Sequence, residues 1–490
     1  MPPLHDLYRP SLALLTDLYE LTMAAAAWKS GIEGVESVFT ASFRKNPFQS
    51  GFTVAAGLGP LIDHLLAYRF GDDDLEFLAS LRDARGAPLF ESRFLDHLRG
   101  LELMLDVDAV PEGTVLFPWE PMVRVRGPVL HCLLVEPSIL ALLNFQSLIA
   151  TKAARVRLAA RGDPVLEFGL RRAQGFDGSL SASRAAYLGG CDATSNVLAA
   201  RMHGIPVKGT HAHAWVMLFE DELEAFRAYA SAMPNNCVLL VDTYQSLEGV
   251  DHAIETGRWL RGQGGDLAGI RLDSGDLAWL SQEARRRLDA AGFPKAAIIA
   301  SNELDEHVIE SLKEQGARID VWGVGTRLVT GADEAALGGV YKLNAVRRPD
   351  GTWSHRVKLS DQAAKTSLPG ILQVRRFRRD GEFLADCIWD ELTGLPSPAV
   401  IVDPLDHTRR REIAAGTAGE DLLVPVLRGG RLVYDRPTLA ASRQRAIDQL
   451  ACLHPGVKRF LNPHQFPVGL ERDLFDLRTR LVLQARGAAG

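Results

Sequence analysis

The chain has 490 residues, of which 47% are hydrophobic and 24% charged, so it is a globular protein with enough length for two or three domains. Its formal net charge of -6 and the lack of any long run of Lys or Arg exclude a protein that attracts nucleic acid through bulk charge.

The cysteines indicate a reducing compartment. Their number is odd and no two have the spacing of metal ligands, which argues against a disulfide scaffold or a zinc site. The N-terminus lacks the basic and apolar regions of a signal peptide, and we expect no unbroken apolar stretch of about 20 residues that would span a membrane. We therefore expect a cytoplasmic protein with no membrane partner.

Residues 1–136 are predicted to form an N-terminal α+β domain. Residues 11–30 carry apolar side chains at helical spacing, and Val38–Phe43 has the pattern of a strand. Residues 106–135 interleave valines with prolines, which is typical of short strands joined by tight turns.

Residues 137–345 show a repeat. A long helix is predicted from Ser138 to Ala160, and strand-like runs then alternate with helical patterns about every 30 residues. The runs are Val165–Phe168, Ile205–Lys208, Val238–Val241, Gly269–Leu272, Ala297–Ala300, Val321–Val324 and Val340–Leu343. Several are apolar without alternation, as in parallel strands that are buried on both faces. The pattern predicts an irregular (β/α) barrel as the catalytic domain.

An open doubly wound sheet is the alternative fold. No G-x-G-x-x-G motif opens the first βα turn, which weakens the dinucleotide-binding version of that fold. In residues 346–490 the repeat stops, and strand-like pieces and turns precede a predicted helix at 437–452. We expect this C-terminal segment to pack with the N-terminal domain, so that a smaller α+β domain built from both ends of the chain flanks the barrel.

Polar groups follow nearly every predicted strand of the barrel. They are Arg171–Arg172–Ala173–Gln174, Gly209–Thr210–His211–Ala212–His213, Asp242–Thr243–Tyr244, Arg271 with Asp273–Ser274–Gly275–Asp276, Ser301–Asn302–Glu303, and Gly323–Val324–Gly325–Thr326–Arg327. Any one of these segments can be a solvated cap or turn. Together they favour a functional site, because the carboxyl ends of barrel strands form one face.

These residue types indicate a chemistry. Backbone N–H groups around Gly323 and Gly325 suit a phosphate. Arg171 and Arg271 suit carboxylate or phosphate oxygens. The carboxylates of Asp273 and Asp276 suit hydrated Mg²⁺ or ribose hydroxyls. A cap and turn before the helix at Leu277 would explain the same residues. The sequence thus predicts an enzyme that acts on a phosphorylated, anionic small molecule with Mg²⁺.

Several segments resemble, in order, the motifs of nicotinate phosphoribosyltransferases. They are Thr16–Asp17–Leu18–Tyr19–Glu20–Leu21–Thr22–Met23, Leu170–Arg171–Arg172–Ala173–Gln174–Gly175, Gly209–Thr210 with Ala212–His213, Arg271–Leu272–Asp273–Ser274–Gly275–Asp276, Gly323–Val324–Gly325–Thr326, Gly338–Gly339–Val340–Tyr341–Lys342–Leu343 and Lys365–Thr366–Ser367–Leu368–Pro369–Gly370. The resemblance extends from residue 16 to about residue 370. The set is specific to this family, whereas no single motif is.

The resemblance implies a type II phosphoribosyltransferase with an irregular α/β barrel, usually a homodimer with shared active sites. Such enzymes make nicotinate mononucleotide and pyrophosphate from nicotinate and phosphoribosyl pyrophosphate, in NAD biosynthesis. They couple the reaction to ATP hydrolysis through a phosphohistidine. The implied cofactor is Mg²⁺, with ATP as co-substrate.

The resemblance also assigns residues. His213 matches the phosphorylated histidine, and Asp273 is expected to be catalytic as well. Thr210 and Arg271 match the groups that hold nicotinate, and Tyr19 matches an aromatic residue that reaches this site, in the partner subunit. The further substrate-binding residues are Arg171, Gly323, Gly325 and Thr326. Candidate metal ligands are Asp273 and Asp276.

One position departs from the family pattern. His211 stands where the family usually has an apolar residue, so a second histidine lies two residues from His213. It can compete as phosphate acceptor, tune the pKa of His213, or only pack at the loop; motif register favours His213 as acceptor. The alternative functions are the related nicotinamide phosphoribosyltransferase, which Tyr19 and Arg271 argue against, and a catalytically silent protein that binds nicotinate or phosphoribosyl pyrophosphate.

Overall fold

The computed structural model describes residues 11–362 and 365–487; residues 1–10, where the N-terminal signal-peptide pattern was sought, lie outside it. The chain divides into two compact units. We call residues 148–335 the central unit, and residues 1–147 with 336–490 the terminal unit. The unit built from both chain ends is the larger of the two, whereas we expected the domain built from both ends to be smaller than the barrel.

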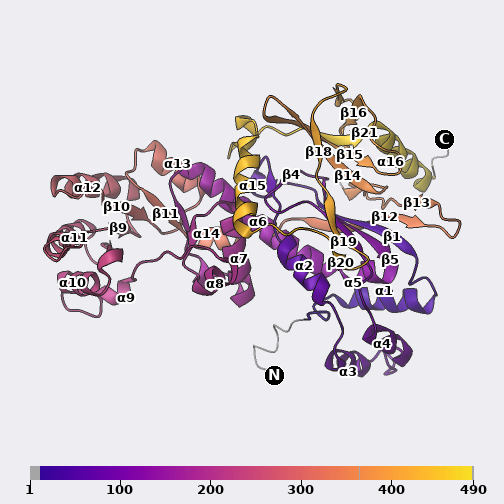
Figure 1. The fold of residues 1–490 in the computed structure, drawn as a ribbon, viewed down its shortest axis with the longest axis horizontal. Coiled ribbons are helices and arrows are strands. Elements are labelled where there is room, and N and C mark those ends of the chain that lie inside the picture. Colours follow the sequence, from indigo (N-terminus) through magenta and orange to yellow (C-terminus); the bar gives the residue numbers. More distant parts are fainter. Residues whose placement is uncertain (1–10, 363–364, 488–490) are drawn as a thin grey trace. The chain divides into compact units, whose positions relative to one another are not determined.

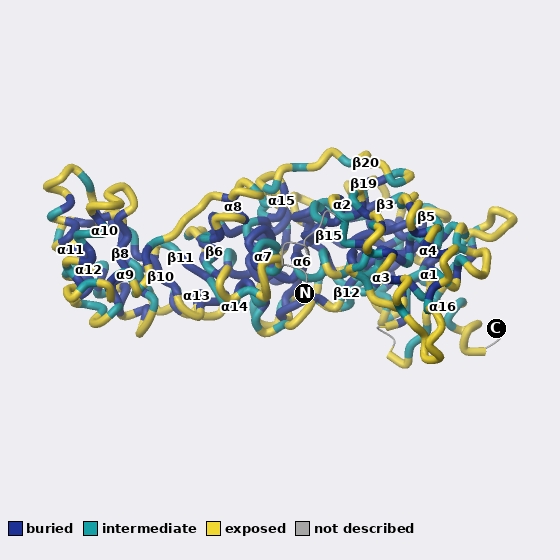
Figure 2. The backbone as a smooth tube through the Cα atoms, turned by 90° about the horizontal axis from the view of Figure 1, so that it is seen from below, coloured by how far each residue is buried: buried dark blue, intermediate teal, exposed yellow. Residues whose placement is uncertain are grey.

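A six-stranded parallel sheet forms the core of the central unit (Figure 1). In spatial order its strands are β7 (Ala193–Thr194), β6 (Val165–Glu167), β11 (Val321–Val324), β10 (Ala297–Ala300), β9 (Gly269–Leu272) and β8 (Val238–Leu240). Their residues are mostly buried, as is usual for the strands of a parallel sheet (Figure 2). The expectation of a mixed α/β protein with a parallel sheet is confirmed.

Helices alternate with these strands. They are α7 (Gly175–Gly189), α8 (Val197–His203), α9 (His213–Val216), α10 (Glu222–Ala232), α11 (Ser246–Arg261), α12 (Leu277–Ala290), α13 (Glu306–Glu314) and α14 (Thr326–Val329), with 3-10 turns at Leu170–Arg172 and Pro234–Asn236. Several begin at the side chain that the sequence supplies as a cap. Asp276 accepts a hydrogen bond from the Trp279 amide at the start of α12, and Asp305 accepts from the His307 and Val308 amides at the start of α13.

Two of the predicted barrel strands are corrected by the structure. Val340–Leu343 belongs to β12 (Gly339–Arg347), which pairs antiparallel with β1 (Glu36–Phe43) in the terminal unit. Ile205–Lys208 forms only an isolated parallel bridge, between Val207 and Thr194 of β7. An apolar run shows that a segment is buried but not which strand it pairs with, so the periodicity overestimated the length of the parallel sheet.

The terminal unit contains three sheets. The seven-stranded sheet has the order β13 (Trp353–His355), β12, β1, β5 (Pro121–Pro128), β3 (Asp106–Ala109), β19 (Val424–Arg428) and β20 (Arg431–Leu432). The six-stranded sheet has the order β17 (Arg410–Ile413), β16 (Ala399–Val402), β21 (Val468–Glu471), β15 (Glu382–Asp390), β14 (Leu372–Arg379) and β18 (Gly419–Asp421). A small sheet pairs β2 (Thr53–Val54) with β4 (Val115–Leu116). Strands from both ends of the chain share the seven-stranded sheet.

The helices of the terminal unit pack around these sheets. They are α1 (Leu18–Lys29), α2 (Leu58–Ala67), α3 (Asp72–Ser80), α4 (Ser92–Arg99), α5 (Val129–Leu134), α15 (Leu439–Ala451) and α16 (Arg472–Ala485), with 3-10 turns at Pro47–Gln49 and Pro455–Lys458. The 25-residue α6 (Glu136–Ala160) begins in this unit, and its residues from 148 onward belong to the central unit.

The segment Val129–Ala160 bears on the expectation that no unbroken apolar stretch would span a membrane. By length and composition it is apolar enough to cross one, although polar residues such as His131, Glu136 and Asn144 interrupt it. More than half of its most apolar window, 56%, is buried inside the protein. Lys152 and Arg155 are almost fully buried and each lies 2.8 Å from a carboxylate oxygen of Glu306. Buried, paired charges of this kind are features of a core helix rather than of a membrane span.

Candidate active site

The site lies at the carboxyl ends of the parallel strands in the central unit. Because all six strands run in the same direction, the segments that follow them reach the same edge of the sheet. Most of the polar groups predicted from the sequence lie on those segments, and side chains from three of them meet at Arg271.

Arg271 is the centre of this cluster. It is the third residue of β9, its side chain is 13% exposed, and its guanidinium lies 5.6 Å from the centroid of the Phe168 ring. Its Nε donates to Ser301 Oγ at 2.8 Å, one Nη donates to Thr210 Oγ1 at 3.1 Å, and the other donates to Asp273 Oδ1 at 3.2 Å. The three partners come from three different strand ends and hold the planar guanidinium in one orientation.

His213 is the first residue of α9, and its side chain is 38% exposed. Its Nδ1 lies 3.1 Å from Thr243 Oγ1, the distance of a hydrogen bond. Its Nε2 lies 3.7 Å from Asp273 Oδ2, which is too long for one. When Nδ1 carries the proton and donates to Thr243, Nε2 keeps an uncommitted lone pair that faces a carboxylate and solvent.

Asp242 is a site residue that we did not assign from the sequence. It is buried, and its Oδ2 accepts hydrogen bonds from the Asp273 amide at 2.8 Å and from Ser274 Oγ at 2.7 Å. Its Oδ1 is also buried and has no hydrogen-bond partner within the described residues. Ser301, the second such residue, donates its Oγ proton to Asp273. Strand-end position was the signal for both residues, but it did not show which side chains point inward.

His211 has a different environment from His213. The residue is 8% exposed, and its ring centroid lies 4.7 Å from that of Tyr229. Its Nε2 accepts a hydrogen bond from the Leu240 amide at 3.1 Å, and its Nδ1 lies 3.3 Å from the Ala212 carbonyl oxygen. Burial lowers the pKa of His211; the hydrogen bond to the Ala212 carbonyl opposes this effect, and the nearby Arg271 and His213 add to it.

The predicted phosphate loop follows β11. A Cβ on Gly323 would lie 2.8 Å from two ring carbons of Phe168, so this position accepts only glycine without movement of that ring. Gly325 precedes the single turn α14, and Thr326 Oγ1 donates to Glu303 Oε1 at 3.2 Å. The neighbouring Arg327 is bound by Asp305 and Asp333. The loop thus offers backbone amides and a hydroxyl, and its arginine is already paired with carboxylates.

The other predicted residues lie outside the Arg271 cluster. Arg171 is exposed on the 3-10 turn after β6, and the structure gives it no hydrogen bond to the cluster. Asp276 caps α12 through Oδ1. Tyr19 lies on α1 of the terminal unit, 49% exposed, and burial and nearby carboxylates raise its pKa. The adjacent Glu20 is buried, which together with Glu136 raises its pKa to about 7.

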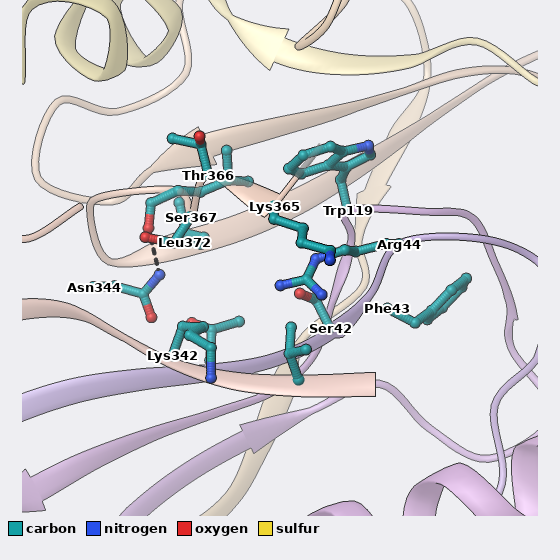
Figure 3. A pocket seen from close by; sticks show the side chains of 13 residues that line it. Ser42, Phe43, Arg44, Trp119, Lys342, Asn344, Lys365, Thr366, Ser367 and Leu372 are labelled. Carbon is teal, nitrogen blue, oxygen red and sulfur yellow. Dashed lines mark hydrogen bonds between the residues drawn. The ribbon is translucent and has the colours of Figure 1, made fainter. Parts of the chain in front are cut away.

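A basic pocket lies within the terminal unit (Figure 3). Arg44 follows β1, Lys342 lies on β12 and Lys365 lies on the loop before β14, and no acidic residue lines the pocket. Its lining residues are Thr40, Ser42, Phe43, Arg44, Trp119, Val340, Lys342, Asn344, Lys365, Thr366, Ser367, Leu368 and Leu372. Asn344 Nδ2 donates to the Leu368 carbonyl oxygen at 2.6 Å and so ties the lysine-bearing loop to β12. Three cations around one pocket suit a polyanion, although Lys342 also lies near the carboxylates of Glu20 and Glu136.

Comparisons with known proteins match most of the chain to a single family. Three family models match it: the nicotinate phosphoribosyltransferase N-terminal domain at residues 14–144, the nicotinate phosphoribosyltransferase family at 164–369, and the corresponding C-terminal domain at 373–478. The nicotinate phosphoribosyltransferase of Bacillus subtilis is 39% identical, with 97% of this chain and 96% of the relative covered. That of Mycobacterium tuberculosis is 41% identical, with 94% and 91% covered. The chain belongs to the nicotinate phosphoribosyltransferase family.

The structural comparison supports the same family. The crystal structure of human nicotinic acid phosphoribosyltransferase has a TM-score of 0.82 and 33% sequence identity, with 95% of this chain and 99% of the human chain covered. The resemblance predicted from the motifs is therefore confirmed. It also extends beyond residue 370, where the quoted motifs ended, because the C-terminal family model matches the segment that follows.

The sequence also predicts that the site holds Mg²⁺. Within residues 11–362 and 365–487, no group of three or more His, Cys, Asp or Glu side chains is arranged to hold a metal ion. The carboxylates at the site are Asp242 and Asp273, and the unpartnered Oδ1 of Asp242 lies buried there. Two carboxylates fit Mg²⁺, which usually keeps several waters and takes its other oxygens from substrate phosphates.

Proposed function

We propose that this protein transfers the phosphoribosyl group of phosphoribosyl pyrophosphate to nicotinate, giving nicotinate mononucleotide and pyrophosphate, with ATP hydrolysis coupled through His213. The observation that carries this proposal is the guanidinium of Arg271, which Thr210 and Ser301 hold in place at the strand ends. A mostly buried, oriented guanidinium is the group that a planar carboxylate pairs with best.

Arg271 would also explain a preference for nicotinate, a carboxylate, over its amide, nicotinamide. A carboxylate can accept two hydrogen bonds from the N–H groups of the guanidinium that its protein partners leave free. The amide of nicotinamide offers one acceptor and places an N–H donor against N–H donors, so one donor of the guanidinium stays without an acceptor, although Asp273 already pairs with its charge. Nicotinate should therefore react faster than nicotinamide, and Thr210, together with Tyr19 of the partner subunit, is proposed to lie beside the pyridine ring.

In the transfer step, the pyridine nitrogen of nicotinate forms a bond to C1 of the ribose while the bond from C1 to the pyrophosphate oxygen breaks. Positive charge develops on the ribose and negative charge on the leaving group. We assign the 5-phosphate to Gly323, Gly325 and Thr326, with Arg171 as an exposed cation that meets the anionic substrate. Within the terminal unit, the basic pocket around Arg44, Lys342 and Lys365 has the charge to bind a polyanion.

In the coupling step, Nε2 of neutral His213 attacks the γ-phosphorus of ATP, a P–N bond forms, and ADP leaves. Water later cleaves this bond and releases phosphate. Thr243 holds Nδ1, which leaves Nε2 free, and the Asp273 carboxylate faces Nε2. Asp242 and Asp273 would hold Mg²⁺, which supplies positive charge to the departing phosphates when bound.

The remaining proposals concern architecture. The parallel sheet of the central unit is proposed to be an irregular barrel, left open between β8 and the segment 205–208 that pairs beside β7, and the α+β elements of the terminal unit are proposed to form a second domain. The protein is proposed to act as a homodimer with shared active sites in the cytoplasm. The five cysteines are unbridged, which fits that compartment.

Pyrophosphate release tests the function. Purified protein is incubated with phosphoribosyl pyrophosphate, Mg²⁺ and either nicotinate or nicotinamide, with and without ATP. Release with nicotinate that ATP enhances is the expected result. Faster release with nicotinamide, or none with either base, would overturn the proposal, and sedimentation of the same sample tests the dimer.

A further inference from the structure

His211 lies on a loop that leaves one edge of the parallel sheet. The segment before it pairs beside β7: the Thr194 amide donates to the Pro206 carbonyl oxygen at 3.0 Å, and the Lys208 amide donates to the Thr194 carbonyl oxygen at 3.1 Å. In the described residues, the sheet order ends with β7 on this side and with β8 on the other. The loop 208–213 therefore begins at one edge of the sheet.

The side chain of His211 reaches the opposite edge. Its Nε2 accepts from the amide of Leu240, the last residue of β8. β8 pairs with β9 through residues 238–240, and the next amide, that of Val241, donates to the Arg271 carbonyl oxygen. Because successive amides of a strand point to opposite sides, the Leu240 amide faces away from β9. Two further contacts link the loop to the residues around β8: Asn236 Nδ2 lies 3.5 Å from the Gly209 carbonyl oxygen, and His213 Nδ1 lies 3.1 Å from Thr243 Oγ1.

The direction of this bond fixes the tautomer. An amide N–H can only donate, so Nε2 of His211 carries no proton, and the ring proton lies on Nδ1, 3.3 Å from the Ala212 carbonyl oxygen. The ring is buried beside Phe226 and Tyr229. This burial disfavours the imidazolium cation, as do the nearby basic groups Arg271 and His213, whereas the Ala212 carbonyl favours it. Neither ring nitrogen is free to accept a phosphoryl group.

The residues beside His211 in the chain belong to the proposed active site. Thr210 places its hydroxyl on Arg271, and His213 places its Nδ1 against Thr243. We infer that His211 is a positioning residue: its neutral imidazole acts as a hydrogen-bonded clasp between the 208–213 loop and β8, and this clasp fixes both Thr210 and His213. Its effect on catalysis rests on the proposed function, whereas the clasp itself can be measured without substrate.

Two matched variants separate hydrogen bonding from packing. In His211→Gln the side-chain oxygen can accept near the position of Nε2, whereas His211→Phe keeps a ring against Tyr229 and has no acceptor. His64→Phe, a half-buried histidine of the terminal unit, controls for the loss of a histidine ring elsewhere. Hydrogen exchange is followed in peptides that contain Leu240.

The expected result is about 10- to 100-fold faster exchange of the Leu240 amide in His211→Phe, with His211→Gln and His64→Phe close to the unmodified protein. The ¹⁵N signals of labelled histidine, assigned by their loss in His211→Gln, should show an unprotonated Nε2. Unchanged exchange in His211→Phe, or a proton on Nε2, would overturn the inference.

Activity then tests the positioning role. His211→Phe should raise the KM for nicotinate and slow the phosphorylation of His213 by ATP, each by about tenfold or more, and His211→Gln should restore both to within about threefold. Equal losses in the two variants, or phosphate found on His211, would overturn it. Failure of the proposed reaction is distinguishable, because it would appear as absent pyrophosphate release in the unmodified protein while exchange still reports the clasp.

Discussion

Replacing Arg271 by alanine should change the discrimination between nicotinate and nicotinamide more than any other property. In the folded protein three neighbours hold the guanidinium, so a bound carboxylate meets an ordered pair of donors. A hydrogen bond to a charged group contributes about 1.5–3 kcal/mol, and a loss of about 3 kcal/mol corresponds to roughly 100-fold in affinity. The variant also leaves Asp273 without its cation, which adds repulsion against the acid but not against the amide.

The assay measures kcat/KM for both bases with saturating phosphoribosyl pyrophosphate. We expect the acid-to-amide ratio to fall by about 100-fold in Arg271→Ala, mainly through the KM for nicotinate. Arg271→Lys, which keeps the charge but not the planar fork, should lie between the two. Because both bases are compared in one enzyme sample, partial unfolding cancels from the ratio. A ratio that stays the same in Arg271→Ala would refute the carboxylate assignment.

Each of the remaining predictions tests the role of one residue. His213→Ala should keep slow nicotinate-dependent release of pyrophosphate and lose its stimulation by ATP, and retained stimulation would remove His213 from the coupling step. Lys365→Ala should weaken pyrophosphate binding about 10- to 100-fold in calorimetry, whereas Lys45→Ala, adjacent to Arg44 but not lining the basic pocket, should not; equal effects would argue against the pocket. Gly323→Ala should lower stability by about 1–3 kcal/mol through contact with Phe168, and Phe168→Leu should restore part of it, which denaturant unfolding measures. The pKa of Glu20 is raised from its ordinary 4.5 to about 7, so its contribution to stability is complete below 4.5 and is lost as pH rises through about 7; Glu20→Gln should raise the Tm at pH 8 more than at pH 5, and an equal change at both would contradict the buried, protonated carboxyl.

The sequence predicted most strands of the parallel sheet, and three of them at their observed bounds. Gly269–Leu272, Ala297–Ala300 and Val321–Val324 were predicted with the bounds that the structure gives, because a parallel strand covered on both faces must be an apolar run between turns. The same reasoning assigned Val340–Leu343 to the wrong sheet, since an apolar run carries no information about its partner. β7 was missed because a two-residue strand has no periodicity.

At the site, residue type and strand-end position singled out Arg271 and Asp273, and the resemblance singled out Thr210; the structure brings all three together. Asp242 and Ser301 stood among the predicted strand-end groups but received no role, because their importance depends on which way a side chain points from its strand end. Contacts of this kind arise from the three-dimensional arrangement of separate strands, so no local pattern contains them.

The two histidines show how position on the sheet, rather than residue type, decides chemistry. His211 and His213 are two residues apart, yet one ring is buried against Tyr229 and the other is more than one-third exposed. The first satisfies an edge amide of β8 and must stay neutral to do so; the second begins a helix and keeps one nitrogen uncommitted. A clasp at His211 would limit the movement of His213. This would keep the proposed nucleophile in one position for its reaction with ATP. The departure from the family pattern at His211 is thus explained by the open side of the sheet, not by a second acceptor.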